Sequence, residues 1–427
     1  MIVPQQPPRP GKRLIGALAG LAAIGLALAG CAAPSAGGGG NASSADAGDC
    51  GVIPQIAPND PNKIVPTLPE SVQADFNGFP SPVLTSAFVT TPAKPGPWKI
   101  GLLFGANLND FTAGSIAQLE KDFAAAKAAG LVEGNDFLRA WAADAASQSP
   151  DLQVSQYQDL VRQGADAIIT VPLSGEAMKP VVDEAGKQGV VTVAIGGDIP
   201  SQYAINIYGN PFQTMAEVMS PTLKSIGGKG NALIVRGLDF LPLDQAQYAA
   251  VNTMLKTCPN VKVAGTVQGG FTQAGAKSEV LSFLTANAAP INAVFQLNVM
   301  APGIISGFEQ AGRDVPSVTM NNAQYGDIAY LAAHVADGYK AWGTANSGAD
   351  QTEAALRAAL RTLSGQGPKT TQFVYVPQLI TPENVADFVV PGTDLSSPGE
   401  INGKGDQPVL PDDQMNAFFT TPKPVLP

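Results

Sequence analysis

Short apolar runs alternate with segments of helical periodicity through the middle of the chain. Ile100–Phe104 has the length and apolar character of a buried strand, and a helical repeat of apolar residues begins at Ile116. Two further strands are expected at Ala167–Val171 and Val190–Ile195, each preceded by a helix that ends at a glycine. This β-α-β-α-β order predicts a parallel sheet with right-handed crossover connections.

The same alternation then repeats in the next part of the chain. Further strands are expected at Ala232–Val235, Val261–Val267, Ala293–Leu297 and Ser317–Met320. Helical patterns lie between them. The sequence therefore predicts an α/β protein with two Rossmann-like lobes, each built on a parallel sheet. Because ligands bind outside the carboxyl ends of parallel strands, the expected site is a cleft between the lobes.

Two proline-rich segments flank this body, at residues 51–97 and 391–427. Proline lacks a backbone donor and fixes φ, which disfavours both helix interiors and central strands. We expect residues 51–97 to form an extended arm on the surface of the body, and residues 391–427 to form a similar tail.

The first 50 residues have the pattern of an export signal followed by a linker. Lys12 and Arg13 precede an uncharged apolar run, which predicts a secretory signal over residues 1–30. The run ends in Leu28-Ala29-Gly30-Cys31, which resembles a bacterial lipobox and implies a lipid on Cys31. A plain signal peptide, or a short membrane helix with an incidental cysteine, is the alternative. Residues 31–50 are rich in Gly, Ser and Ala, which is typical of a flexible tether.

The composition of the chain disfavours several kinds of functional site. With 25 Lys+Arg against 35 Asp+Glu, the net charge is −10, which opposes binding to nucleic acid. His334 is the one histidine and no CxxC spacing exists, so no metal or cofactor is expected. A catalytic Ser/His or Cys/His pair would have to use His334. Cys50 and Cys258 either form a disulfide, which an exported compartment permits, or remain separate thiols.

Several stretches in order resemble the ribose-binding-protein family, which has the type I periplasmic sugar-binding fold. They are Ile100–Phe111, Gln158–Gly197, Gly228–Gly237 and Ile291–Arg313. The resemblance covers about residues 99–380. It implies three crossings between the lobes, near Tyr208, Asn346 and Gln372. Lobe 1 is then residues 99–209 plus 347–372, and lobe 2 is residues 210–346 plus 373–390.

The resemblance also implies which side chains contact the ligand. They are Asn109, Phe111, Asp198, Gln247, Phe271, Asn298, Asn321 and Gln324. Aromatic rings can stack on the C–H face of a sugar, and amides both donate to and accept from hydroxyls. A structural role stays open for each of them, such as a helix cap for Asn109.

This sequence departs from the ribose-binding type at its charged positions. That type holds hydroxyls with Asp and Arg side chains, where this chain has Gly196-Gly197-Asp198, Gln247 and Asn321. Charge-assisted hydrogen bonds are roughly twice as strong as neutral ones, so ribose itself does not carry over as the ligand. A sugar or another small polyhydroxylated ligand is expected.

The family works by hinge closure around one ligand, which is then delivered to a membrane transporter. We therefore expect a monomeric, lipid-anchored solute-binding protein of an ABC importer, on the outer face of the cell membrane, with a permease as partner. A sensory lipoprotein that presents its ligand to a membrane receptor is the alternative. An enzyme is disfavoured, because no nucleophile motif such as GxSxG accompanies the single histidine.

Overall fold

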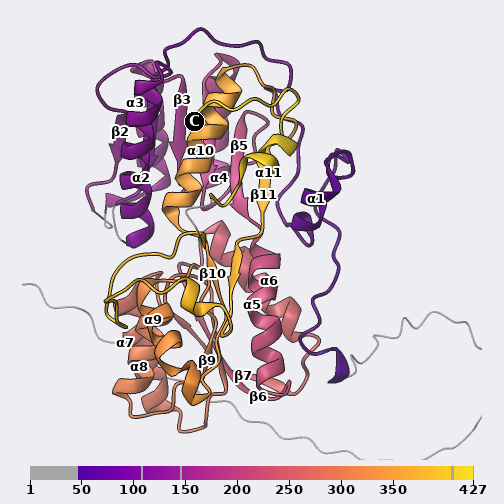
Figure 1. Ribbon diagram of the computed structural model, residues 1–427, viewed down its shortest axis with the longest axis vertical. Coiled ribbons are helices and arrows are strands. Elements are labelled where there is room, and N and C mark those ends of the chain that lie inside the picture. Colours follow the sequence, from indigo (N-terminus) through magenta and orange to yellow (C-terminus); the bar gives the residue numbers. More distant parts are fainter. Residues whose placement is uncertain (1–46, 107–108, 145–146, 405–407, 427) are drawn as a thin grey trace, which may run out of the picture. The chain divides into compact units, whose positions relative to one another are not determined.

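The computed structural model describes residues 47–106, 109–144, 147–404 and 408–426. Cys31 and the expected signal at residues 1–30 lie outside the described residues, as does most of the expected tether. The described residues form a single folded unit, in which Figure 1 shows two α/β lobes. No helix among the described residues is both long enough and apolar enough to span a lipid bilayer.

Lobe 1, as far as the structure describes it, is built on a six-stranded parallel sheet in the order β11-β5-β4-β3-β1-β2. Its strands are β1 (Ile100–Phe104), β2 (Leu138–Trp141), β3 (Ala167–Thr170), β4 (Val191–Ile195), β5 (Ala204–Gly209) and β11 (Gln372–Tyr375). Its main helices are α2 (Asp110–Ala128), α3 (Pro150–Arg162), α4 (Gly175–Lys187) and α10 (Gly348–Leu363). Strands β1, β3 and β4 are buried at every position, as strands covered on both faces must be.

Lobe 2 has a parallel sheet of four strands within the described residues, in the order β7-β6-β8-β9. The strands are β6 (Gly230–Arg236), β7 (Val261–Gln268), β8 (Ala293–Gln296) and β9 (Ser317–Val318). The helices are α5 (Pro211–Ser225), α6 (Pro242–Leu255), α7 (Gln273–Ala286), α8 (Ala301–Gln310) and α9 (Tyr325–His334). The predicted α/β class with parallel sheets in two lobes is confirmed.

The chain passes between the two sheets after β5, between β10 (Gly343–Ala345) and α10, and between β11 and β12 (Gln378–Ile380). Strands β10 and β12 form an antiparallel pair, and Gly343 also bridges to Met320 beside the lobe 2 sheet. The third crossing comes later than the position expected near Gln372. Strand β11 stays paired with β5 through Tyr375, because its side chains are buried in the core of lobe 1.

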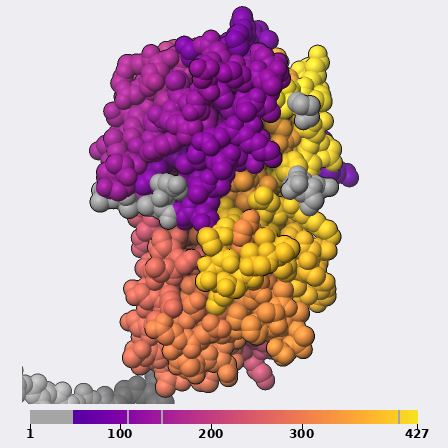
Figure 2. Space-filling view, turned by 60° about the vertical axis from the view of Figure 1, so that its left-hand side comes forward, coloured from indigo at the N-terminus to yellow at the C-terminus, as the bar shows by residue number. Residues whose placement is uncertain are grey.

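The arm was expected to be extended and to lie on the surface, but it and the C-terminal end of the tail bury apolar side chains in the core of lobe 1, so this expectation was wrong. The arm includes the short helix α1 (Glu70–Gln73) and buries Phe76 and Phe79 in the cluster beneath the lobe 1 sheet. The tail includes α11 (Asp412–Ala417), and Phe418 stacks on Phe373 with ring centroids 4.7 Å apart. Figure 2 shows the C-terminal residues, in yellow, lying over parts of both lobes.

A disulfide links the start of the arm to lobe 2. Cys50 and Cys258 are bonded, with an Sγ–Sγ distance of 2.05 Å. Nearby, the hydroxyl of Ser220 on α5 donates to the carbonyl of Gly51. The arm therefore starts on lobe 2 and continues into the core of lobe 1.

Candidate ligand-binding cleft

A cavity of about 150 Å³ lies where the carboxyl ends of strands from both sheets come together. Its lining comprises Asn109, Phe111, Val171, Pro172, Leu173, Gly196, Gly197, Tyr208, Gly209, Pro211, Thr214, Leu241, Pro242, Leu243, Gln247, Phe271, Asn298, Val299, Asn321, Asn322, Asn346 and Gln351. An apolar cavity of about this size holds a benzene molecule, so the cleft has room for one small ligand.

The cleft combines neutral polar side chains with apolar walls and carries no charge. Of the described residues that line it, none is an Asp, Glu, Lys, Arg or His. Its polar side chains are amides, together with the hydroxyls of Thr214 and Tyr208. Burial raises the pKa of the Tyr208 hydroxyl well above its usual value, so this group stays neutral as well. A charged ligand would enter this site without an opposite charge to offset its desolvation.

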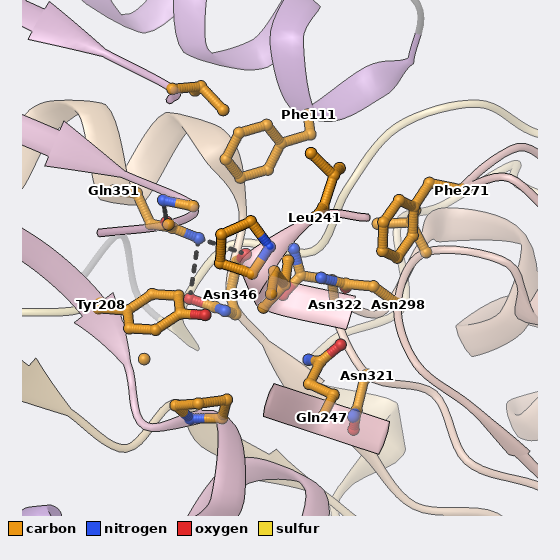
Figure 3. Close-up of a pocket in the computed structure, with 18 of the residues that line it drawn as sticks. Phe111, Tyr208, Leu241, Gln247, Phe271, Asn298, Asn321, Asn322, Asn346 and Gln351 are labelled. Atoms are coloured by element: carbon orange, nitrogen blue, oxygen red, sulfur yellow. Dashed lines mark hydrogen bonds between the residues drawn. The ribbon is translucent and has the colours of Figure 1, made fainter. Parts of the chain in front are cut away.

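Polar atoms without a protein partner gather on the lobe 2 side of the cleft. They are Thr214 Oγ1, Gln247 Oε1, Asn298 Oδ1 and Asn321 Oδ1. Each of these residues is at most 8% exposed. They come from different elements, namely α5, α6 and the segments after β8 and β9 (Figure 3). A buried polar atom without a partner costs about 1–3 kcal/mol, so their convergence on one cavity marks a place where a ligand can bond.

Two amides that line the cleft near the second crossing, Asn346 and Gln351, are held by hydrogen bonds within the protein. Gln351 Nε2 donates to Asn346 Oδ1 at 3.3 Å, and the Tyr375 hydroxyl donates to the same oxygen at 2.7 Å. The backbone N–H of Gly196 donates to Gln351 Oε1 at 3.2 Å. This network fixes the two side chains before any ligand arrives.

Strained backbone marks the lobe 2 edge of the cleft. Among the described residues, four that are not glycine have positive φ, and three of them line the cleft, namely Phe271 (+56°), Val299 (+48°) and Asn322 (+49°). Such conformations cost on the order of 1 kcal/mol each and cluster at functional sites. The Phe271 ring also lies against Gly237, where a Cβ atom would fall 2.1 Å from the ring. The Phe271 ring is therefore held at the cleft by a backbone conformation that is itself unfavourable.

The structure brings together Asn109, Phe111, Gln247, Phe271, Asn298 and Asn321, all of which line the cleft. Asn109 also caps α2, because its Oδ1 accepts from the backbone N–H of Thr112 at 3.2 Å. Gln324 lies outside this cleft, at a neighbouring opening, and forms a capping box with Asp327 at the start of α9.

Asp198 does not line the cleft, contrary to the expectation from the sequence. It lies in the loop between β4 and β5, where its carboxyl is hydrogen-bonded to Ser81 of the arm. Burial raises the pKa of this carboxyl, while the hydrogen bond from Ser81 lowers it. The expectation was wrong because the arm, which covers this loop, provides the carboxyl with a partner on the protein.

Several lining residues were not among the expected contacts, including Tyr208, Thr214, Asn346 and Gln351. Tyr208 and Asn346 were expected only as positions where the chain crosses between lobes. Thr214 and Gln351 lie in the first turns of α5 and α10, the helices that follow two of the crossings. Polar residues in a first helical turn after a crossing are the signal that could have identified them.

No group of His, Cys, Asp and Glu side chains in the described part of the chain is arranged to hold a metal ion.

Two α/β lobes joined by several crossings, with a neutral polar cleft at the carboxyl ends of their strands, define a two-lobed binding protein for a small molecule. Residues 100–367 match the family model of the periplasmic binding protein domain, and the chain belongs to this family. The family implies a location outside the cytoplasm.

Similar proteins agree with this assignment. The xylitol-binding protein of Mycolicibacterium smegmatis is 26% identical over 57% of this chain and 68% of the relative. An ABC transporter solute-binding protein of Thermobispora bispora is 26% identical, with a TM-score of 0.60 over 69% of this chain and 92% of that structure. A solute-binding protein of Bacillus halodurans, solved with bound myo-inositol, has a TM-score of 0.58 at 18% identity, over 68% of this chain and 96% of that structure, and shows the shared fold.

Proposed function

We propose that this protein binds a small, uncharged polyol or sugar in the cleft between its lobes and delivers it to an ABC importer. The observation that carries the proposal is the set of unpartnered neutral polar atoms that converge on a cleft in which no described lining residue is charged. Hydroxyl groups donate and accept hydrogen bonds without a net charge, so they match these partners. The names of the relatives, a xylitol-binding protein and a solute-binding protein with bound myo-inositol, support the same class of ligand.

The ligand's carbon skeleton meets the apolar part of the lining. Phe111 and Phe271 provide aromatic faces for C–H groups, and Leu241 and Leu243 add aliphatic surface. A ligand with both hydroxyls and exposed C–H faces satisfies both kinds of wall. Because lining residues come from both lobes, such a ligand binds best when the lobes are closed and shifts the population toward that state.

The proposal includes a lipid on Cys31 and a position on the outer face of the cell membrane. The support is the Leu28-Ala29-Gly30-Cys31 sequence after an apolar run, together with the family's extracytoplasmic location. A tether over residues 31–50 leaves the folded unit free to reach a permease. We propose that the protein acts as a monomer, since one chain contains both walls of the cleft.

Thermal unfolding of residues 48–427 with a panel of pentoses, hexoses, sugar alcohols, inositols, amino acids and nucleosides tests the function. A ligand at about 1,000 times its dissociation constant stabilises by roughly 4 kcal/mol. At roughly 2–4 °C per kcal/mol, the midpoint rises by on the order of 10 °C. A rise confined to neutral sugars or polyols supports the proposal. A rise with amino acids or acidic sugars alone contradicts the proposed class of ligand.

A further inference from the structure

A segment of the C-terminal tail, residues 395–401, contacts both lobes beside the cleft, and we call it the strap. Its attachment to lobe 2 is made of backbone pairs and apolar contacts. The N–H of Tyr325 donates to the carbonyl of Gly399 at 2.8 Å, and the N–H of Ile401 donates to the carbonyl of Ala323 at 2.8 Å. Ile401 is buried in the core of lobe 2, and Leu395 packs against the same core. The strap is thus built into lobe 2.

Among the described residues, two hydrogen bonds connect the strap to lobe 1. Each joins a carboxyl group to a backbone N–H at the first residue of a helix or in the strap. The N–H of Gly399 donates to Asp110 Oδ2 at 2.6 Å, where Asp110 is the first residue of α2. The N–H of Gly348, the first residue of α10, donates to Glu400 Oε2 at 2.8 Å. A hydrogen bond between a carboxylate, such as that of Asp110, and a backbone N–H group is stronger than a neutral one.

Glu400 is buried between the lobes at 8% exposure. Burial raises the pKa of its carboxyl to about 8, and the nearby carboxylates of Asp110 and Asp350 add to the increase, while the N–H of Gly348 opposes it. Gln324, the N-cap residue of α9 in lobe 2, pairs with Glu400 through a backbone bridge, and a hydrogen bond from its side chain lowers the pKa of the Glu400 carboxyl. A buried carboxyl that contacts elements of both lobes at once belongs to an interlobe contact, because separating the lobes would expose it.

The strap also forms one wall of an opening that adjoins the cleft. This opening shares Asn109, Phe111, Phe271 and Val299 with the cleft and is closed on another side by residues 395–398. The strap therefore lies next to both aromatic rings that face the ligand cavity. A molecule that leaves the cleft on this side passes the strap.

We propose that the strap is a latch of the ligand site, which holds the lobes together through Glu400 and Gly399 and so slows ligand release. The strap separates from lobe 1 when the lobes open. Backbone pairs and buried apolar side chains hold the strap on lobe 2, whereas its contacts with lobe 1 are the hydrogen bonds of Gly399 and Glu400. The latch rests on the proposed function only in its effect on the ligand, since the interlobe contacts are present without one.

The experiment compares Glu400→Ala, which removes the contact with Gly348, with Glu400→Gln, which keeps an acceptor oxygen of the same reach. Asp110→Ala breaks the other contact independently. Asp413→Ala is the control, because Asp413 is an exposed carboxylate of the same tail on α11. Hydrogen exchange of the Gly348 and Gly399 amides is measured in ligand-free protein. The dissociation rate is measured with xylitol as the probe, or with the panel member that binds.

We expect Glu400→Ala and Asp110→Ala to raise amide exchange at both glycines and to speed probe dissociation about tenfold, the equivalent of one lost hydrogen bond. Glu400→Gln and Asp413→Ala should match the original protein. The latch is refuted if the two alanine variants exchange like Asp413→Ala while remaining folded. If no panel member binds, the proposed function fails, and the exchange rates still decide the latch.

Discussion

Replacing Asn321 by Leu should stabilise the empty protein and weaken ligand binding. Asn321 is 1% exposed, and its Oδ1 has no hydrogen-bond partner. Within the described part of the chain, its Nδ2 donates to a thioether, the sulfur of Met215, at 2.9 Å. An unpartnered buried oxygen costs about 1–3 kcal/mol, and an apolar side chain of similar length removes that cost. Leucine has the same number of side-chain heavy atoms as asparagine, and the adjoining cavity leaves room for its two methyl groups.

The matched control is Asn206 on β5, an equally buried amide whose two ends are both paired. Its Oδ1 accepts from the N–H of Ile199 at 2.9 Å, and its Nδ2 donates to the carbonyls of Ile199 and Thr371 at 3.2 Å. Asn206→Leu leaves the buried N–H of Ile199 without its partner, while the carbonyls of Ile199 and Thr371 keep the backbone N–H groups of Ser201 and Asn206. We expect it to lower the free energy of unfolding by about 1–3 kcal/mol.

The assay is calorimetric melting of both variants, without ligand and with a saturating polyol from the panel. For Asn321→Leu the ligand-free midpoint should rise by a few degrees, at roughly 2–4 °C per kcal/mol. Ligand affinity should fall by about tenfold to a hundredfold, because a ligand hydroxyl loses its partner. If Asn321→Leu instead lowers the midpoint as Asn206→Leu does and leaves affinity unchanged, Asn321 is a structural amide and the reasoning is wrong.

Three further changes test other parts of the structure. Gly237→Ala places a Cβ atom against the Phe271 ring and should weaken polyol binding about tenfold in titration calorimetry, with the fold retained by circular dichroism. Because the pKa of Glu400 is raised to about 8 in the folded state, that state keeps a proton which the unfolded chain releases. The free energy of unfolding should therefore fall as pH rises from about 4.5 to about 8, and Glu400→Gln should reduce this slope in urea titrations. Cys50→Ser with Cys258→Ser opens a link across a sequence separation of 208 and should lower stability by up to about 5 kcal/mol in denaturant titration.

Several strands of both sheets that are buried on both faces could be predicted. Strands β1, β3, β4 and β8 read as continuous apolar runs because helices cover both faces of a parallel sheet. The edge strand β2 was missed, since its residues are half exposed and give no such run. Strands β5 and β11 were also missed although they are buried, because polar residues such as Asn206 and Gln372 interrupt their apolar pattern. Candidate contacts that follow directly after strands, such as Asn298 and Asn321, could be placed because the carboxyl ends of parallel strands share one edge.

Contacts that depend on residues distant in the chain could not be predicted. Asp198 lies after a strand as the others do, yet Ser81 of the arm binds its carboxyl away from the cleft. Gln351 enters the cleft only because α10 follows a crossing and packs against the loop at Gly196. Local pattern specifies that such a residue is polar, while the packing of another segment decides which way it points.

By itself, the sequence determined the α/β class, the repeat of two lobes and the edge of each sheet where polar residues gather. These depend on periodicity and strand direction, which are local properties of the chain. Only the tertiary structure decided that the proline-rich arm and the C-terminal end of the tail complete lobe 1, and that the strap contacts Asp110 through Gly399. It alone showed which amides lack a partner, because a hydrogen bond is satisfied or left open by groups brought together from distant parts of the chain.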